Sequence, residues 1–231
     1  MSIVGLSDGD PIDLATDQSS AGDDGTQTGS NRPIYKTGIL NGLPVMRFNG
    51  TDQWLNMANS WPIPPATMFV VWNCAVAPPP SSHTDIASSA LLGSNRNGLS
   101  YSLFTNVSSE LRTMAALAQN QDLVGPSALT RSTSTWYATG FSYDGTSPVP
   151  SYYRGRPTDP CTDGNIGVGI TIGWGLTDAS IGATPLFGSP GVFKDFLAGD
   201  LAALLAYDRV LGEGEKIQTL CYLSGKYALG M

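Results

Sequence analysis

Short apolar segments alternate with clusters of turn-forming residues along most of the chain. Thr67–Ala77 is almost continuously apolar, which is typical of a strand buried on both faces. The predicted strand Leu99–Asn106 alternates instead over Leu99–Thr105, as a half-buried strand does. Trp136–Tyr143 ends at the turn formers Asp144 and Gly145, which predicts a hairpin with the segment that follows. The other predicted strands are Pro44–Asn49, Gln53–Met57, Leu91–Ser94, Leu111–Ala118, Val149–Arg154, Gly167–Trp174 and Leu201–Tyr207. This pattern predicts an all-β protein built as an antiparallel β-sandwich.

One helix is predicted, near the C-terminus, from about Glu213 to Tyr227. Its apolar face is expected to hold the residues Ile217, Leu220, Cys221, Ser224 and Tyr227, which follow helical spacing. We expect this short helix to pack on the edge or the end of the sandwich. Residues 1–40 and 175–194 are rich in turn formers, so the first is predicted to be an irregular N-terminal segment and the second a long loop.

Length and charge limit the number of domains and the kinds of partner that are expected. A chain of 231 residues can form one large β domain, and we expect a single domain over residues 1–231. Charged residues make up 13% and the net charge is −7, with no run of Lys or Arg, so nucleic-acid binding is not expected. The sequence has no apolar segment of about 18 residues, so no membrane span is expected.

The sequence has three cysteines, an odd and sparse number that argues against a disulfide framework. Cys74 lies in a predicted strand and Cys221 on the predicted apolar helix face, so both are expected to be buried as small apolar side chains. Cys161 lies in a predicted loop and is expected to be a free thiol.

Two segments, Asn41–Leu55 and Gly199–Met231, resemble the concanavalin A-like, laminin-G-like jelly-roll family, which occurs in extracellular and phage structural proteins. The matching residues are Asn41, Gly42, Pro44, Arg47, Phe48, Gly50, Asp52 and Leu55, then Tyr207, Asp208, Arg209, Leu211, Lys226 and Tyr227. The resemblance implies a jelly-roll β-sandwich. It also implies an N-terminal edge strand, for which only Ser2–Val4 remain, so a partner chain could complete the sheet.

Catalysis is not expected. Sugar hydrolases of this fold place several carboxylates along one strand, and the three glutamates, Glu110, Glu213 and Glu215, form no such run. The one histidine, His83, lies in a Pro-rich loop without a nucleophile motif. The sequence therefore predicts a protein that is not an enzyme. It indicates no cofactor, apart from the calcium considered next.

Calcium is the one metal that the resemblance allows, because laminin-G-like modules often bind Ca²⁺ through oxygen-rich loops. Asn49 and Asp52 lie at a matching family position and are the predicted metal ligands. The aspartate pairs Asp23 with Asp24 and Asp159 with Asp163 are further candidates. The alternative is that these residues only stabilise turns, which Asn and Asp commonly do.

A glycan could stack on aromatic side chains beside loops, and Tyr152, Tyr153 and Trp174 are the predicted ligand-binding residues. The other tryptophans, Trp54, Trp61, Trp72 and Trp136, are expected in the core or at its rim.

The resulting hypothesis is a non-enzymatic structural or binding protein on a phage particle surface, either a head decoration protein or a tail-associated adhesin. The start MSIVGLSDGD lacks a secretory signal, which is expected of a protein that reaches the virion surface by lysis. Its partners would be other virion proteins, further copies in a trimer or dimer, and a host-surface glycan. The alternative is a free extracellular carbohydrate-binding module, with calcium as a candidate cofactor.

Overall fold

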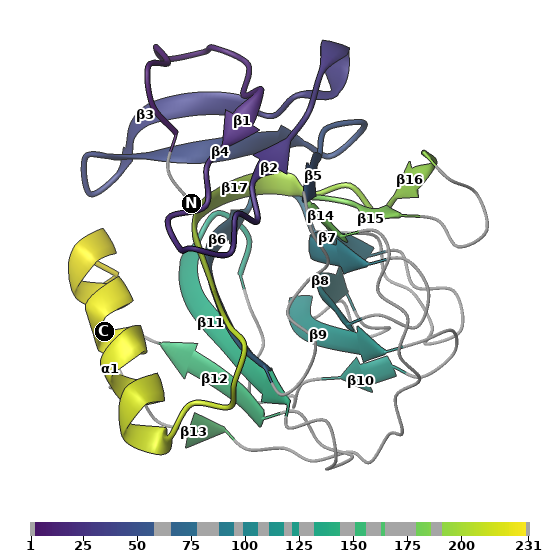
Figure 1. The fold of residues 1–231 in the computed structure, drawn as a ribbon. Helices are drawn as coiled ribbons and strands as arrows, with labels where there is room; N and C mark the ends of the chain where they lie inside the picture. The colour runs from purple at the N-terminus through teal and green to yellow at the C-terminus, as the bar shows by residue number, and fades with distance from the viewer. Residues whose placement is uncertain are drawn as a thin grey trace.

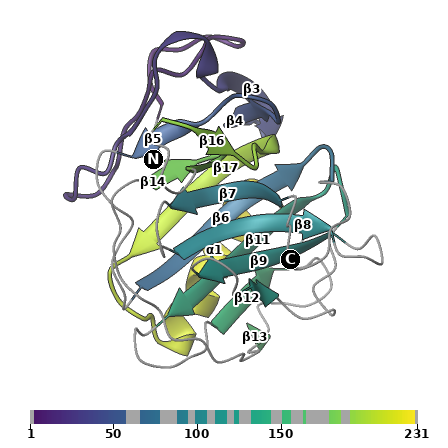
Figure 2. The same ribbon diagram turned by 90° about the vertical axis from the view of Figure 1, so that its right-hand side faces the viewer.

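The protein is a sandwich of two antiparallel sheets with a helix on the outside of one of them (Figure 1). The computed structural model describes residues 3–57, 66–77, 88–94, 99–105, 111–117, 122–124, 132–143, 151–155, 163–164, 179–185 and 191–229. Viewed from the side, strands β7, β8 and β9 lie in front of β6, β11 and β17, with the helix α1 behind (Figure 2). The predicted β-sandwich with a C-terminal helix is therefore confirmed.

Two large sheets hold most of the described strands. The first runs in the order β1 (Leu14–Ala15), β2 (Gly25–Thr26), β5 (Leu55–Met57), β14 (Ala179–Ile181), β7 (Ser88–Ser94), β8 (Leu99–Thr105), β9 (Leu111–Leu117) and β10 (Asp122–Val124). The second runs β13 (Asp163–Gly164), β12 (Ser151–Gly155), β11 (Trp136–Tyr143), β6 (Ala66–Cys74), β17 (Ala198–Tyr207), β4 (Leu43–Asn49) and β3 (Ile34–Leu40). A small hairpin pairs β15 (Thr184–Pro185) with β16 (Phe193–Lys194), and η1 is a short 3₁₀ turn at Gly29–Asn31.

The central strand β6 is buried along its whole length, as its continuous apolar sequence predicts. Successive side chains of a strand point to opposite faces of the sheet. Trp72 therefore faces the core between the two sheets, where its Nε1 donates to Thr139 Oγ1 at 2.8 Å. Phe69 and Val71 face the other way and pack under α1. The protein thus has one core between the sheets and another between the second sheet and the helix.

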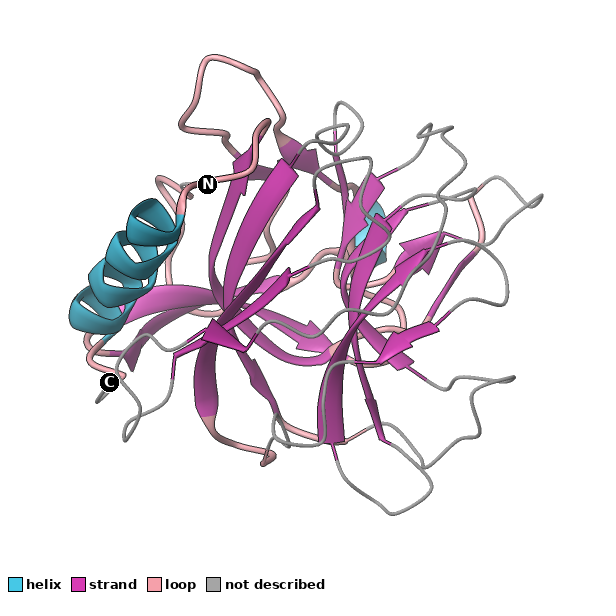
Figure 3. Cartoon of the chain, turned by 90° about the horizontal axis from the view of Figure 1, so that it is seen from below, coloured by secondary structure: helices cyan, strands magenta, loops and turns pink. Residues whose placement is uncertain are grey.

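The helix α1 (Glu213–Tyr227) lies on the outer face of the second sheet, against β11 and β12. Figure 3 shows the helix outside the sandwich, beside its strands. This corrects the expectation that it packs on the edge or the end. Its buried residues are Lys216, Leu220, Leu223, Ser224 and Tyr227. Ile217 is 37% exposed and Cys221 is exposed, so the predicted apolar face is wrong at these two positions. The buried stripe includes the aliphatic stem of Lys216, whose ammonium stays within 3.7 Å of Glu213.

Cys221 is disulfide-bonded, which corrects the expectation of a buried free thiol at that position. Cys74 is free and buried, as expected, and burial raises the pKa of its thiol to about 11. Cys161 lies outside the described residues.

The segment 1–40 is more ordered than its turn-rich sequence suggests. It contributes β1, β2 and the edge strand β3. Backbone groups of residues 9–12 pair with β3: Gly9 N donates to Tyr35 O, and Tyr35 N donates to Asp10 O, both at 2.8 Å. Asp8 adds bonds to Lys36 and Thr37. Residues 8–12 therefore occupy the edge that a partner strand would need, so strand addition at β3 is not supported.

The segment 175–194, expected to be a loop, also contains strands. β14 joins the first sheet by pairing with β5 and β7. β15 and β16 form the small hairpin. The predicted strand Gly167–Trp174 lies outside the described residues. In the part of the chain that the structure describes, α1 is too short and too polar to cross a membrane.

Replacing Phe69 with Ala should destabilise the protein by about 3–5 kcal/mol, because it leaves a cavity under α1. Urea unfolding would measure the loss. The control Val210→Ala, at a position 37% exposed, should change stability by no more than about 0.5 kcal/mol. Equal effects of the two substitutions would contradict the packing described for β6.

Candidate functional site

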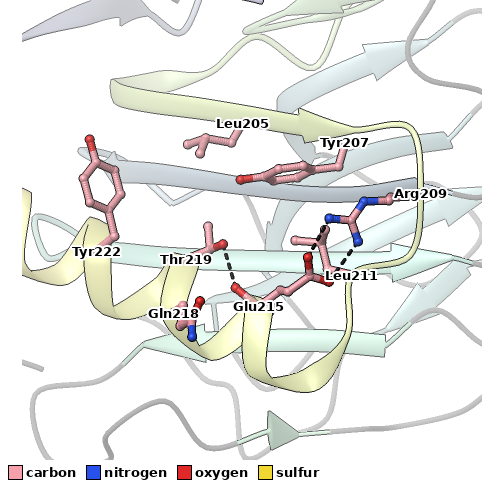
Figure 4. Close-up of a pocket in the computed structure, with 8 residues that line it drawn as sticks. All are labelled: Leu205, Tyr207, Arg209, Leu211, Glu215, Gln218, Thr219 and Tyr222. Carbon is pink, nitrogen blue, oxygen red and sulfur yellow. Dashed lines mark hydrogen bonds and ion pairs between the residues drawn. The ribbon is translucent and has the colours of Figure 1, made fainter.

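A shallow groove of about 370 Å³ runs between the end of β17 and α1 (Figure 4). Its lining residues come from the last strand, the turn after it and one face of the helix. They are Leu205, Tyr207, Arg209, Leu211, Glu215, Gln218, Thr219 and Tyr222. The volume is at the low end of the range for small-molecule sites in proteins.

Local periodicity brings these side chains together. Leu205 and Tyr207 are two residues apart in β17, so both face α1. On the helix, Glu215, Thr219 and Tyr222 follow the i, i+4, i+7 spacing that places side chains on one face. The groove is therefore the space between a strand face and a helix face that the fold holds side by side.

An ion pair closes the end of the groove nearest the turn. The Arg209 guanidinium binds the Glu215 carboxylate through two bonds, of 2.8 and 2.6 Å. The Gly212 N–H also donates to Glu215 Oε2, at 2.8 Å, which caps the start of α1. The bonds from Arg209 and Gly212 lower the pKa of Glu215 from its ordinary 4.5 to about 2. The same pairing raises the pKa of Arg209.

An exposed tyrosine marks the opposite end of the groove (Figure 4). Tyr222 is 58% exposed, which is high for so large an aromatic side chain. Tyr207, between the two ends, is half-buried and its ring meets that of Phe69 edge-on at 6.4 Å. The groove therefore offers one accessible aromatic ring and one that is fixed in place by packing.

Neutral polar groups lie between these rings and the ion pair. Thr219 Oγ1 donates to the backbone oxygen of Glu215 at 2.8 Å, and so keeps lone pairs for another donor. Gln218 is exposed. Aromatic surface beside hydroxyl and amide groups suits a ligand with both apolar faces and hydroxyls.

A second, smaller cavity of about 220 Å³ lies beside the C-terminal end of α1. It forms where the ladder between β4 and β17 stops: these strands pair from Ala198 to Leu201, and a bulge follows in β17. Its lining is mostly apolar, with Lys226 and Tyr227 contributed by the helix. The Tyr227 hydroxyl donates to Ala202 O at 2.9 Å.

The predicted calcium ligands, Asn49 and Asp52, lie together in the turn between β4 and β5. Asn49 Nδ2 donates to Asp52 Oδ1 at 2.7 Å, and Asn49 Oδ1 accepts from the backbone N–H groups of Thr51 and Asp52. These bonds are those of an Asx turn. Within the described ranges, no group of three or more acidic, His or Cys side chains could hold a metal ion. Calcium at this turn stays a prediction.

The predicted calcium pair Asp23 and Asp24 lies in the loop between β1 and β2. Asp17 of the same loop accepts from Ser19 and from the Asp23 N–H, and these bonds lower its pKa to about 2. Asp24 accepts from the Asp17 N–H. The loop thus uses its carboxylates to bind its own backbone.

Of the predicted glycan-binding residues, Tyr152 and Tyr153 belong to β12, which pairs with β11 and β13 and packs against α1. Trp174 lies outside the described residues. These three residues stay predictions. Of the other tryptophans, Trp72 is fully buried and Trp136 packs partly buried against the helix core, as expected. Trp54 stacks on Phe193 at the surface, at a centroid distance of 4.2 Å, as a rim residue.

The sequence did not single out Tyr222 as a site residue. It was not among the residues expected on the apolar face of the helix. Its spacing from Glu215 is a signal that could have identified it. Tyr222 follows Glu215 by seven residues, so both side chains lie on the same face of the helix.

Comparison with known proteins supports the fold. No protein-family model matches the chain. No curated protein sequence matches it either. Solved structures do match, at low sequence identity.

A heptameric SAP-like pentraxin from Limulus polyphemus is 14% identical, with a TM-score of 0.54 over 75% of this chain and 80% of that chain. A Trypanosoma rangeli sialidase in complex with sialic acid is 15% identical, with a TM-score of 0.51 over 95% of this chain but 34% of that one. Domain 4 of AbnA, an extracellular arabinanase from Geobacillus stearothermophilus, is 13% identical with a TM-score of 0.49, covering 84% of this chain and 83% of that one. At these identities the likeness concerns the fold, and the pentraxin and sialidase matches support the jelly-roll β-sandwich.

Lowering the pH should remove the stabilisation that comes from Glu215. Its folded pKa, about 2, lies below its ordinary value of 4.5, so its contribution is present above about pH 4.5 and is lost as the pH falls toward 2. Glu215→Gln should therefore lower the urea midpoint near neutral pH, and the difference from the natural protein should shrink in acid. A difference that does not change with pH would contradict the ion pair.

Proposed function

We propose that this protein is a non-enzymatic carbohydrate-binding β-sandwich whose ligand lies in the groove between β17 and α1. The observation that carries the proposal is Tyr222, an exposed aromatic ring at one end of a groove whose other end is fixed by an ion pair. A sugar ring presents apolar C–H faces and hydroxyl groups. Aromatic side chains can stack on the C–H faces. Thr219, Gln218 and the ion pair can hydrogen-bond with the hydroxyl groups.

The chemistry of the groove favours binding over catalysis. Glu215, its one carboxylate, has a pKa of about 2 and is held by Arg209. A general acid for glycoside cleavage needs a raised pKa and a second carboxylate across the bond. Glu215 is therefore an ionised anchor for Arg209 and for the start of the helix.

One of the matching structures, the sialidase complex, also points toward sugars. It was solved with sialic acid bound, and it shares this fold with a TM-score of 0.51. The chain spans about a third of that sialidase, 34% of its length. The comparison therefore supports a role in binding sugars. It does not indicate where a sugar would bind, and that part of the proposal depends on the groove.

We place the protein outside the cell, on a virion surface, as a head decoration protein or a tail-associated adhesin. The support from the structure is the disulfide at Cys221, because such bonds persist in oxidising surroundings that include virion and cell surfaces. A virion protein of this kind would contact other virion proteins and, as a dimer or trimer, a host-surface glycan. A free extracellular carbohydrate-binding module is the alternative and would use the same groove.

Immunogold electron microscopy of lysate from the source culture should show label on particles. Label on heads identifies a decoration protein, and label on tails identifies an adhesin. Label only on cells or in free solution would remove the virion assignment and favour the free module.

A glycan array should give at least one bound oligosaccharide. Tyr222→Ala should raise its Kd about tenfold, which corresponds to about 1.4 kcal/mol, because an accessible aromatic anchor is lost. Isothermal titration calorimetry would measure it.

The matched control is Ile217→Ala, at a position on the same helix that is 37% exposed and does not line the groove. It should leave the Kd unchanged. If Tyr153→Ala or Trp174→Ala abolishes binding while Tyr222→Ala does not, the site lies at the residues predicted from the sequence and the groove is excluded.

A further inference from the structure

Lys226 differs from the other basic side chains that the structure describes, because it pairs with no carboxylate there. The others form ion pairs: Arg32 with Asp13, Lys36 with Asp8, Arg47 with Asp200, Lys194 with Asp195, Arg209 with Glu215 and Lys216 with Glu213. In a protein of net charge −7, an exposed cation without an acidic partner is unusual.

Capping of the helix does not account for Lys226. A basic side chain in the last turn can bind the free carbonyl groups of a helix end. Here those groups have other donors: Ser224 O accepts from Leu229 N at 3.1 Å, and Gly225 O from Ala228 N at 3.4 Å. Lys226 O accepts from Asn41 Nδ2 at 2.9 Å. The Lys226 ammonium interacts with the Tyr227 side chain, and no described carboxylate neutralises its charge.

Lys226 does not line the groove itself, but it lies beside Tyr222, which does. Lys226 follows Tyr222 by one helical turn, and its Nζ lies 5.8 Å from the centre of the Tyr222 ring. It also lies 5.3 Å from the centre of the Tyr227 ring. Tyr227 is only 4% exposed, whereas Tyr222 is 58% exposed, so the accessible aromatic neighbour of the cation is Tyr222.

We infer that the groove selects an acidic sugar, one that carries a carboxylate or a sulfate ester. This inference rests on the proposed carbohydrate-binding function. A sugar ring stacked on Tyr222 would bring such a group to Lys226. Lysine is a compact point charge without the forked geometry of arginine, so it suits either anion. The rest of the protein is acidic and repels an anion, so this selectivity depends on one cation and falls with added salt.

Lys226 also borders the apolar cavity between β4 and β17, where a fatty carboxylate could place its tail. The acidic sugar is favoured because that cavity is the smaller of the two, at about 220 Å³ against about 370 Å³, and Tyr227 beside it is buried. A fatty acid is therefore kept as an outcome of the test.

The test compares oligogalacturonate with its methyl ester, which lacks the charge, by isothermal titration calorimetry at low salt. The natural protein should bind the acid about tenfold more tightly than the ester. Lys226→Gln should bring this ratio to about one, and Lys226→Arg should keep most of it. Lys36→Gln is the control, since the charge of Lys36 is already neutralised by Asp8. A sulfated galactan and its desulfated form, tested in parallel, distinguish the two anions, and preference for either charged form supports the inference.

Three results would overturn it. If acid and ester bind equally and Tyr222→Ala weakens both, the groove binds sugars without selecting charge, and the proposed function stands without this inference. If no saccharide binds at all, the inference and the proposed function both fail. If octanoate binds in a Lys226-dependent way and no acidic saccharide does, Lys226 serves the apolar cavity instead.

Discussion

Burial of β6 on both faces is the constraint on which the rest of the structure depends. Trp72 and the other β6 side chains on its face are buried against the first sheet. Phe69 and Val71 point to the opposite face and must be buried by another element. A sheet with one uncovered apolar face would expose Phe69 to water, at a cost of about 1.5–3 kcal/mol for that side chain alone. The helix α1 provides the second cover, and this is why it lies on a face of the sheet and not at its edge.

The groove follows from that arrangement. β17 pairs with β6 as far as Tyr207, and the chain then turns and returns as α1 across the same face of the sheet. The turn is held by Arg209 and Glu215, so the strand and helix faces keep a fixed separation. A site built on packed, regular elements is better pre-organised than one on loops. The side chain that stays exposed, Tyr222, is therefore presented by a rigid support.

The sequence was sufficient where burial dominates. The apolar run of β6, the strand Trp136–Tyr143 and the bounds of α1 agree with the structure, because each follows from periodicity. It was insufficient where pairing is decided by distant contacts. The disulfide of Cys221 and the cover that residues 8–12 give to β3 depend on which segments meet in space. The groove was not predicted for the same reason. One of its walls is a strand and the other a helix, and the sequence alone does not show that the two lie side by side.

The most direct test of the account is chemical-shift mapping by NMR with the tightest-binding oligosaccharide. The account predicts that the largest amide shifts occur at Tyr207, Thr219 and Tyr222, on the two walls of the groove. Shifts confined to the turn of Asn49 and Asp52, or to β12, would contradict it and place the ligand at one of the sites predicted from the sequence.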